Sequence, residues 1–167
     1  MPAVSDVELV RIGPEGWREF REVRLASLAD SPGAFGARYA DWVDADEQRW
    51  RARLTDVPFT VVARSDGEPV GVVCGAQSED VVELISMWVA PSQRGTCLAG
   101  RLIDQVVAWA AARGQQTCLM VRDDNVGAIR AYARAGFIDH GVPEDWPAEA
   151  PRERRMRHRG SGASHLA

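Results

Sequence analysis

Residues 87–137 read MWVAPSQRGTCLAGRLIDQVVAWAAARGQQTCLMVRDDNVGAIRAYARAGF, and the spacing of the apolar residues changes repeatedly along this stretch. The strand that ends at Val89 is broken by Pro91, and from Gly95 to Ala112 apolar residues recur at helical spacing. A short apolar strand, a second helix and the start of another strand follow at Thr117–Val121, Asn125–Ala135 and Phe137–Asp139. This alternation predicts a β-α-β-α-β crossover unit.

The remaining residues indicate antiparallel strands and two more helices. Strands are predicted at Val7–Ile12, Phe59–Arg64, Val70–Cys74 and Val81–Val89, and helices from about Gly16 to Leu28 and from Asp44 to Leu54. Asp66-Gly67 marks a hairpin turn. The loop Val142–Pro151 and a final edge strand, Arg152–Arg159, follow the crossover unit. The order β-α-α-β-β-β-α-β-α-β-β predicts an α/β fold with one mixed sheet, as a single domain over residues 1–159 with a disordered tail at 160–167.

The composition limits the classes of function. The chain has 167 residues, of which 46% are hydrophobic, and carries 24 acidic against 20 basic residues. This balance argues against a nucleic-acid-binding protein, which usually presents a basic face. Every basic residue is Arg, so P-loop nucleotide chemistry, which needs a Lys at the phosphates, is excluded.

The cysteines, histidines and apolar segments give no sign of a metal or a membrane. Cys74, Cys97 and Cys118 are widely spaced and odd in number, and His140, His158 and His165 lack metal-ligand spacing. The first ten residues lack a signal-peptide pattern, and no apolar run reaches about 18 residues. We therefore expect a cytoplasmic protein without a metal, a nucleic-acid partner or a membrane partner.

The junction between Val89 and Gly100 joins a strand to a helix through a turn of small residues. The first turn of a helix has unpaired N–H groups that attract anions, so such a turn can hold a pyrophosphate. Arg94 and Arg101 add positive charge nearby. Tight strand–helix packing would also explain the small residues. The dinucleotide fingerprint G-x-G-x-x-G is not spelled, which disfavours a nicotinamide cofactor.

A second pattern, at residues 125–137, supports the first and carries a family resemblance. The chain resembles the GNAT superfamily of acyl-CoA-dependent N-acyltransferases, whose signature N-x-x-A-x-x-x-Y-x-x-x-G-F is matched by Asn125, Ala128, Tyr132, Gly136 and Phe137. The family's coenzyme loop, [Q/R]-x-x-G-x-[G/A], begins at Arg94 and ends at Ala99. Cys97 stands where the pattern has Gly, and its side chain is expected to crowd the approach of the phosphates.

The resemblance implies a site for acetyl-CoA as co-substrate and roles for individual residues. Tyr132 would protonate the leaving thiolate, Glu83 would act as the general base, and the Val89 N–H would polarise the thioester carbonyl. Two-residue periodicity places Glu83 on the same face as Ile85, Met87 and Val89. A solvent-exposed acid and a core aromatic are the plain structural alternatives for Glu83 and Tyr132. The implied coenzyme-binding residues are Met87, Trp88, Val89, Arg94, Gly95, Thr96, Cys97, Leu98, Ala99, Gly100, Asn125 and Ala128.

The acceptor is the least defined part of the function. Acids in the segments that would border the acceptor entrance (Asp41, Asp44, Glu144, Asp145 and Glu149) favour a cationic amine. The sequence therefore predicts an enzyme that acetylates a primary amine of a small molecule in a ternary complex. The alternatives are a protein or peptide N-acetyltransferase and a non-catalytic acyl-CoA-binding module. A homodimer is compatible with the predicted edge strand Arg152–Arg159.

Overall fold

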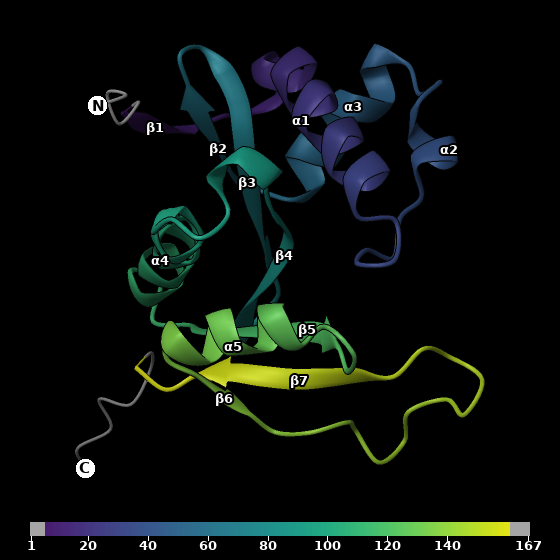
Figure 1. The fold of residues 1–167 in the computed structure, drawn as a ribbon, viewed down its shortest axis with the longest axis vertical. Coiled ribbons are helices and arrows are strands. Elements are labelled where there is room, and N and C mark those ends of the chain that lie inside the picture. The colour runs from purple at the N-terminus through teal and green to yellow at the C-terminus, as the bar shows by residue number, and fades with distance from the viewer. Residues whose placement is uncertain (1–5, 161–167) are drawn as a thin grey trace.

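Seven strands form one mixed sheet in the order β1-β2-β3-β4-β5-β7-β6 in the computed structural model, which describes residues 6–160 (Figure 1). The strands are β1 (Val7–Arg11), β2 (Phe59–Ser65), β3 (Glu68–Gln77), β4 (Val81–Val89), β5 (Gln116–Arg122), β6 (Phe137–Asp139) and β7 (Glu153–His158). The helices are α1 (Trp17–Asp30), α2 (Tyr39–Trp42), α3 (Glu47–Asp56), α4 (Leu98–Ala111) and α5 (Val126–Arg134). The predicted mixed α/β fold is confirmed, with the short α2 as an addition. The predicted tail lies outside the described residues, apart from Gly160.

Helices cover both faces of the first half of the sheet, with α4 on one side and α1 and α3 on the other (Figure 1). All five apolar residues of the predicted α4 stripe, Leu98, Leu102, Val106, Trp109 and Ala110, are buried. Because β2 and β3 are covered on both faces, their side chains are buried along almost their whole length. The result is two apolar cores, one on each face of the sheet.

The hairpin between β2 and β3 turns at the predicted Asp66-Gly67 pair. Both residues have positive φ angles, 51° and 81°, which are those that a two-residue type I′ turn requires. Ser65 lies opposite Glu68 in the antiparallel register. The turn residues therefore determine how β2 and β3 pair next to the turn, up to the register shift between Ala63 and Arg64.

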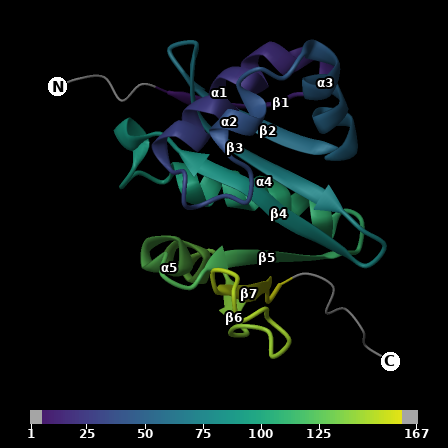
Figure 2. The same ribbon diagram turned by 90° about the vertical axis from the view of Figure 1, so that its right-hand side faces the viewer.

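β4 and β5 form the only parallel pair among the described strands, and they pair over a short distance. Their register covers Val81, Val82 and Glu83 opposite Gln116, Thr117 and Cys118. Beyond these pairs the two strands separate, as Figure 2 shows from the side. The sheet is thus divided at its centre, and the ends of β4 and β5 lie on either side of the division.

A bulge in β4 contradicts the predicted alternation along this strand. Ser86 has a φ of 56°, and the register with β3 slips so that Ser86 and Met87 together lie opposite Val73. Ile85 packs in the core under α1 and α3, whereas Met87 and Val89 pack against the core under α4. The prediction that Glu83 and Ile85 share a face with Met87 and Val89 is therefore wrong.

The last strand does not lie at the edge of the sheet. β7 lies between β5 and β6, and the three-residue β6 forms the edge. Met156 is fully buried, while Arg155 and Arg157 point to the opposite, exposed face. The edge-strand interpretation of Arg152–Arg159 is wrong, and with it the argument for a homodimer through this strand.

Candidate active site

A cleft of about 600 Å³ opens where β4 and β5 separate. Its floor and walls come from the second half of β4, the end of β5, the start of α4, α5, and the segment between α1 and α2. Of the residues predicted from the sequence, nine line this cleft: Glu83, Met87, Trp88, Val89, Arg94, Ala99, Asn125, Ala128 and Tyr132. The structure therefore brings both predicted catalytic residues and most of the predicted coenzyme site together.

Five predicted coenzyme-loop residues do not line the cleft itself. Leu98 is buried in the core beneath α4, whereas Gly95, Thr96, Cys97 and Gly100 are exposed at the start of the helix. In the loop, the Thr96 hydroxyl donates to the Gln93 carbonyl at 2.6 Å and accepts from the Leu98 N–H at 3.3 Å. The loop is therefore closed by its own hydrogen bonds before the helix begins.

The N-terminus of α4 is suited to an anionic ligand. Thr96 accepts from the Leu98 N–H, but among the described residues no side chain bonds the N–H groups that follow it, and the first turn carries no acid, so these groups are available to an anion. The left-handed conformation falls on Gly95, with a φ of 76°, whereas Cys97 has a φ of −80° that any residue adopts. Cys97 therefore causes no backbone strain, and only its side chain can impede a ligand.

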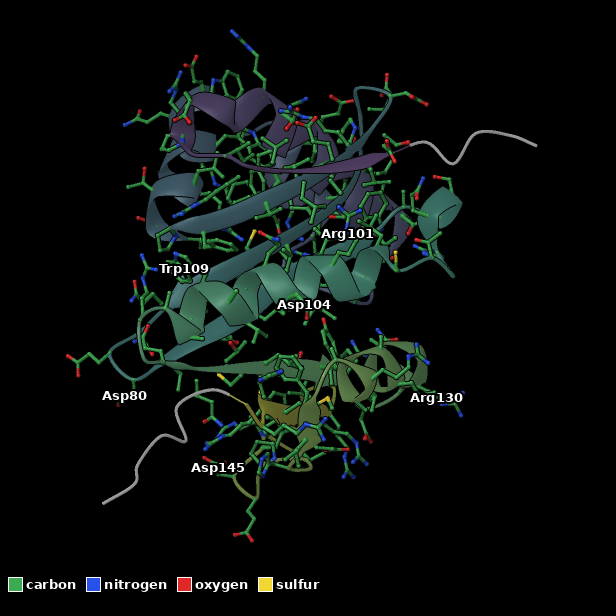
Figure 3. The ribbon with its side chains drawn as sticks, turned by 90° about the vertical axis from the view of Figure 1, so that its left-hand side faces the viewer. Asp80, Arg101, Asp104, Trp109, Arg130 and Asp145 are labelled. Atoms are coloured by element: carbon green, nitrogen blue, oxygen red, sulfur yellow. The ribbon has the colours of Figure 1, made fainter. Side chains whose placement is uncertain are left out.

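The two arginines predicted to add charge near this turn lie apart. Arg94 lines the cleft, where it pairs with the Asp30 carboxylate and donates to the Val89 carbonyl at 3.2 Å. Trp88 Nε1 also donates to Asp30, at 2.9 Å, and these two donors hold the pKa of Asp30 below its usual value. Arg101 instead donates to the Val7 carbonyl at 3.2 Å, between α4 and β1 (Figure 3).

Tyr132 lies on the inner face of α5 and is 9% exposed. Burial raises the pKa of its hydroxyl, so the side chain is protonated at neutral pH. Its ring packs edge-on against Phe137 at 5.7 Å, and the hydroxyl makes no hydrogen bond within residues 6–160. Asn125 caps the same helix by accepting from the Ala128 N–H at 3.2 Å, which sets the direction in which α5 presents Tyr132.

Glu83 lies exposed at the start of the cleft, opposite Cys118 of β5. Burial, followed by the charge of Glu83, raises the pKa of the Cys118 thiol. A thiol with a raised pKa is a poor nucleophile, which disfavours a covalent route through Cys118. A second carboxylate in the cleft, Glu153 of β7, was not predicted, because only the pairing of β7 with β5 brings it there.

The charged lining of the cleft is mainly basic. Four arginines, Arg24, Arg53, Arg94 and Arg122, face two glutamates, Glu83 and Glu153. None of the five acids expected at the acceptor entrance lines the cleft, and Figure 3 shows Asp145 at the end of the molecule remote from α1 and α3. Arg122 donates to the Gly33 carbonyl at 3.1 Å and so joins β5 to the segment after α1.

The described residues contain no group of three or more His, Cys, Asp or Glu side chains arranged to hold a metal ion. Within the same residues, no helix combines the length and the apolar character needed to cross a membrane.

Comparisons with known proteins agree with the fold and the site. Residues 21–137 match the model of the acetyltransferase (GNAT) family. An uncharacterised N-acetyltransferase of Mycobacterium tuberculosis is 34% identical over 124 residues, which cover 71% of this chain and 80% of the relative.

Two solved structures share the fold. A GNAT-family acetyltransferase from Streptococcus pneumoniae superposes with a TM-score of 0.73 at 16% identity, over 91% of this chain and 97% of its own. The PaiA N-acetyltransferase from Thermoplasma acidophilum, solved in complex with coenzyme A, superposes with a TM-score of 0.71 at 15% identity. The match covers 92% of this chain and 98% of the PaiA chain. The chain therefore belongs to the GNAT acetyltransferase family and is an N-acetyltransferase that takes its acetyl group from a coenzyme A thioester.

Proposed function

We propose that this enzyme transfers an acetyl group from acetyl-CoA directly to the primary amine of a small molecule, with both reactants bound together. The observation that carries the proposal is that Glu83 and Val89 of β4 and Tyr132 of α5 line one cleft beside the N-terminus of α4. Holding two reactants in one cleft removes much of the entropic part of the barrier.

The coenzyme site fits the residues present. The unpaired N–H groups at the start of α4 would hold the pyrophosphate, and Asn125 and Ala128 would border the pantetheine arm. When bound, acetyl-CoA supplies the activated acetyl group. Arg94 is held by Asp30 and the Val89 carbonyl, so in this arrangement it shapes the wall of the cleft between the helix end and β4.

The Val89 N–H would donate to the thioester carbonyl. The neighbouring Ala90 N–H donates to the Val70 carbonyl of β3 at 2.8 Å. In an antiparallel pair, N–H groups of adjacent residues point to opposite sides of the strand, so the Val89 N–H points away from β3. On that side β5 has separated from β4, and no strand competes for the donor. A preorganised donor of this kind supports charge that develops on the oxygen.

Proton transfers would involve Glu83 and Tyr132. A primary ammonium has a pKa near about 10, so it must lose a proton before it can attack. Glu83 would accept this proton, directly or through water, at its carboxylate. Tyr132, which burial keeps protonated, would donate its hydroxyl proton to the departing thiolate sulfur. The nitrogen would lose its second proton to solvent as the amide forms, and both residues would then return to their starting states through solvent.

Release of free thiol in a mixture of the protein, acetyl-CoA and a panel of amines tests the proposal. We expect turnover of at least one small primary amine, with initial-rate plots that intersect as a ternary complex requires. Parallel plots would contradict direct transfer. Binding of acetyl-CoA without turnover of any amine would instead support a non-catalytic acyl-CoA-binding module.

A further inference from the structure

Arg24 is a buried cation with no carboxylate partner among residues 6–160. It projects from α1, is 7% exposed, and its Nη1 makes no hydrogen bond. Burial lowers its pKa to about 10, so it still carries its charge at neutral pH. Its only ring contact is with Phe35, whose centroid lies 4.6 Å from the guanidinium carbon. Burying a charge without a counter-ion is costly, and proteins rarely do so without a functional reason.

Arg53 places a second guanidinium beside the first. It projects from α3, donates from Nη2 to the Ser86 hydroxyl at 3.1 Å, and leaves its buried Nη1 without a partner. Its charge contributes to the lowered pKa of Arg24. Neither arginine forms an ion pair within residues 6–160, although Glu19 of the same helix α1 holds Arg64 with two hydrogen bonds of 2.7 Å. Arg64 thus has a carboxylate partner, whereas Arg24 and Arg53 have none among residues 6–160.

Both arginines line a small recess. It measures about 30 Å³ and is lined by Phe20, Arg24, Ala37, Trp42, Trp50 and Arg53. Arg24, Ala37 and Arg53 also line the main cleft, so the recess adjoins the site where the acceptor would bind. The Trp50 Nε1–H is a third buried donor without a partner. Every unpaired polar group around the recess is therefore a donor.

Such a lining selects an anion that accepts hydrogen bonds. A water in the recess would accept two hydrogen bonds but would leave two positive charges uncompensated. A carboxylate is planar, carries two acceptor oxygens, and matches the planar fork of a guanidinium. An ammonium or a neutral amide group would be disfavoured there.

We propose that this recess binds the carboxylate of the acceptor, so that the substrate is an amino acid or a similar small amine that also bears a carboxylate. The inference rests on the proposed acetyl transfer to a small amine. The carboxylate would lie between Arg24 and Arg53, and the amine would extend along β4 past Ser86 toward Glu83 and Val89. The basic lining of the cleft agrees with such a substrate, and the acids that suggested a purely cationic amine lie outside it.

The test compares each common amino acid that has a primary amine and no thiol with its C-terminal amide, by free-thiol release with acetyl-CoA. We expect at least one free acid to exceed its amide more than tenfold in kcat/KM. Arg24→Gln and Arg53→Gln should each abolish that preference. The matched control is Arg51→Gln on the same helix as Arg53; Arg51 is exposed and pairs with Glu47 at 2.8 Å, so the preference should persist. Amides turned over as well as acids, or a preference that survives Arg24→Gln, would overturn the proposal.

A binding measurement separates this inference from acetyl transfer. N-acetylglycine, its amide and inorganic phosphate are added separately, and the shift in melting temperature is measured for the wild type, Arg24→Gln and Arg53→Gln. Stabilisation of the wild type by N-acetylglycine alone, lost in both variants, supports the carboxylate site even if no amine in the panel is turned over. An equal shift with phosphate that is also lost in both variants, or no shift with N-acetylglycine, would overturn it. If one variant fails to fold, the other gives the same comparison.

Discussion

The two walls of the cleft are built in different ways. The proposed coenzyme wall comprises Val89, Arg94 and Ala99 together with Asn125, Ala128 and Tyr132; it comes from residues 89–132 and presents backbone N–H groups and a tyrosine. The acceptor wall, Arg24, Phe35–Ala37 and Arg53, draws on α1, the following segment and α3, and presents charged side chains. A ligand common to a whole family can be held by backbone groups, whereas the ligand specific to one member needs particular side chains.

The state of the arginines shows the same contrast. Arg94 of the coenzyme wall is paired with Asp30, while Arg24 of the acceptor wall has no counter-ion among the described residues. A paired arginine stabilises the shape of a wall. An unpaired arginine lowers the stability of the free protein, and an anionic ligand that binds it would restore that stability.

The largest expected effect concerns the coenzyme wall. Tyr132→Phe should lower kcat by roughly 10²-fold or more, because the leaving thiolate loses its proton donor. The dissociation constant for acetyl-CoA should stay close to that of the wild type, since the ring still packs on Phe137. Single-turnover kinetics and calorimetry measure the two quantities. Full turnover in the variant would show that Tyr132 is a core aromatic without a catalytic role.

The general base can be located by comparing the two carboxylates of the cleft. Glu83→Gln should lower kcat/KM by about 10²-fold, because the acceptor ammonium loses its proton acceptor. Glu79→Gln, which removes an exposed acid from the adjacent turn, is the matched control and should resemble the wild type. A larger loss in Glu153→Gln than in Glu83→Gln would move the base to β7.

Replacement of Arg24 on the acceptor wall should raise the stability of the protein and weaken binding of the acceptor. Arg24→Met removes an unpaired buried charge and should raise the free energy of unfolding by roughly 1–3 kcal/mol at pH 7, as measured in urea. The penalty is complete below about pH 10, where Arg24 is charged in both the folded and unfolded states, and it shrinks above that pH as the folded state releases the proton. The free energies of unfolding of the wild type and Arg24→Met should therefore converge at high pH. A variant less stable than the wild type would show that Arg24 holds the core together.

The smallest expected effect is on acetyl-CoA binding at the coenzyme loop. Cys97→Gly should tighten acetyl-CoA binding a few-fold, or by less than about 1.4 kcal/mol, because an exposed side chain is removed from the approach to the helix N-terminus. Cys97→Ser keeps a side chain of similar size and should leave the dissociation constant unchanged. An unchanged or weaker constant in Cys97→Gly would contradict the crowding argument.

The elements of the fold and the coenzyme wall could be predicted because their signals are local. Gly95, Asn125 and Gly136 mark the loop, the cap and the end of a helix, and each has the conformation or contact that its residue type favours. The acceptor wall gives no such signal. Arg18, Arg21 and Arg24 all lie on α1, and only the packing of α3 and Phe35 buries the third of them. The cytoplasmic location remains a prediction.

Two predictions about the sheet, the edge position of the last strand and the regular alternation along β4, are wrong for the same reason: both depend on tertiary structure. Alternating residues predict a strand in 153–158, but they do not say whether a further strand, here the three-residue β6, pairs on its outer side. Likewise, no glycine or other turn-forming residue predicts the bulge at Ser86. Serine rarely adopts a positive φ, and nothing in the neighbouring residues requires one there. Both features depend on what the neighbouring strands do.

Because of the bulge at Ser86, the two halves of β4 direct comparable side chains to opposite faces of the sheet. Before it, Glu83 and Ile85 face the side of α1 and α3, and after it Met87 and Val89 face the side of α4. The serine hydroxyl at the change of face accepts a hydrogen bond from Arg53, so the same residue that redirects the strand also anchors the acceptor wall. One strand can therefore present its first half to the amine and its second half to the thioester. The two reactants would meet only at the end of β4, where β5 no longer closes the gap.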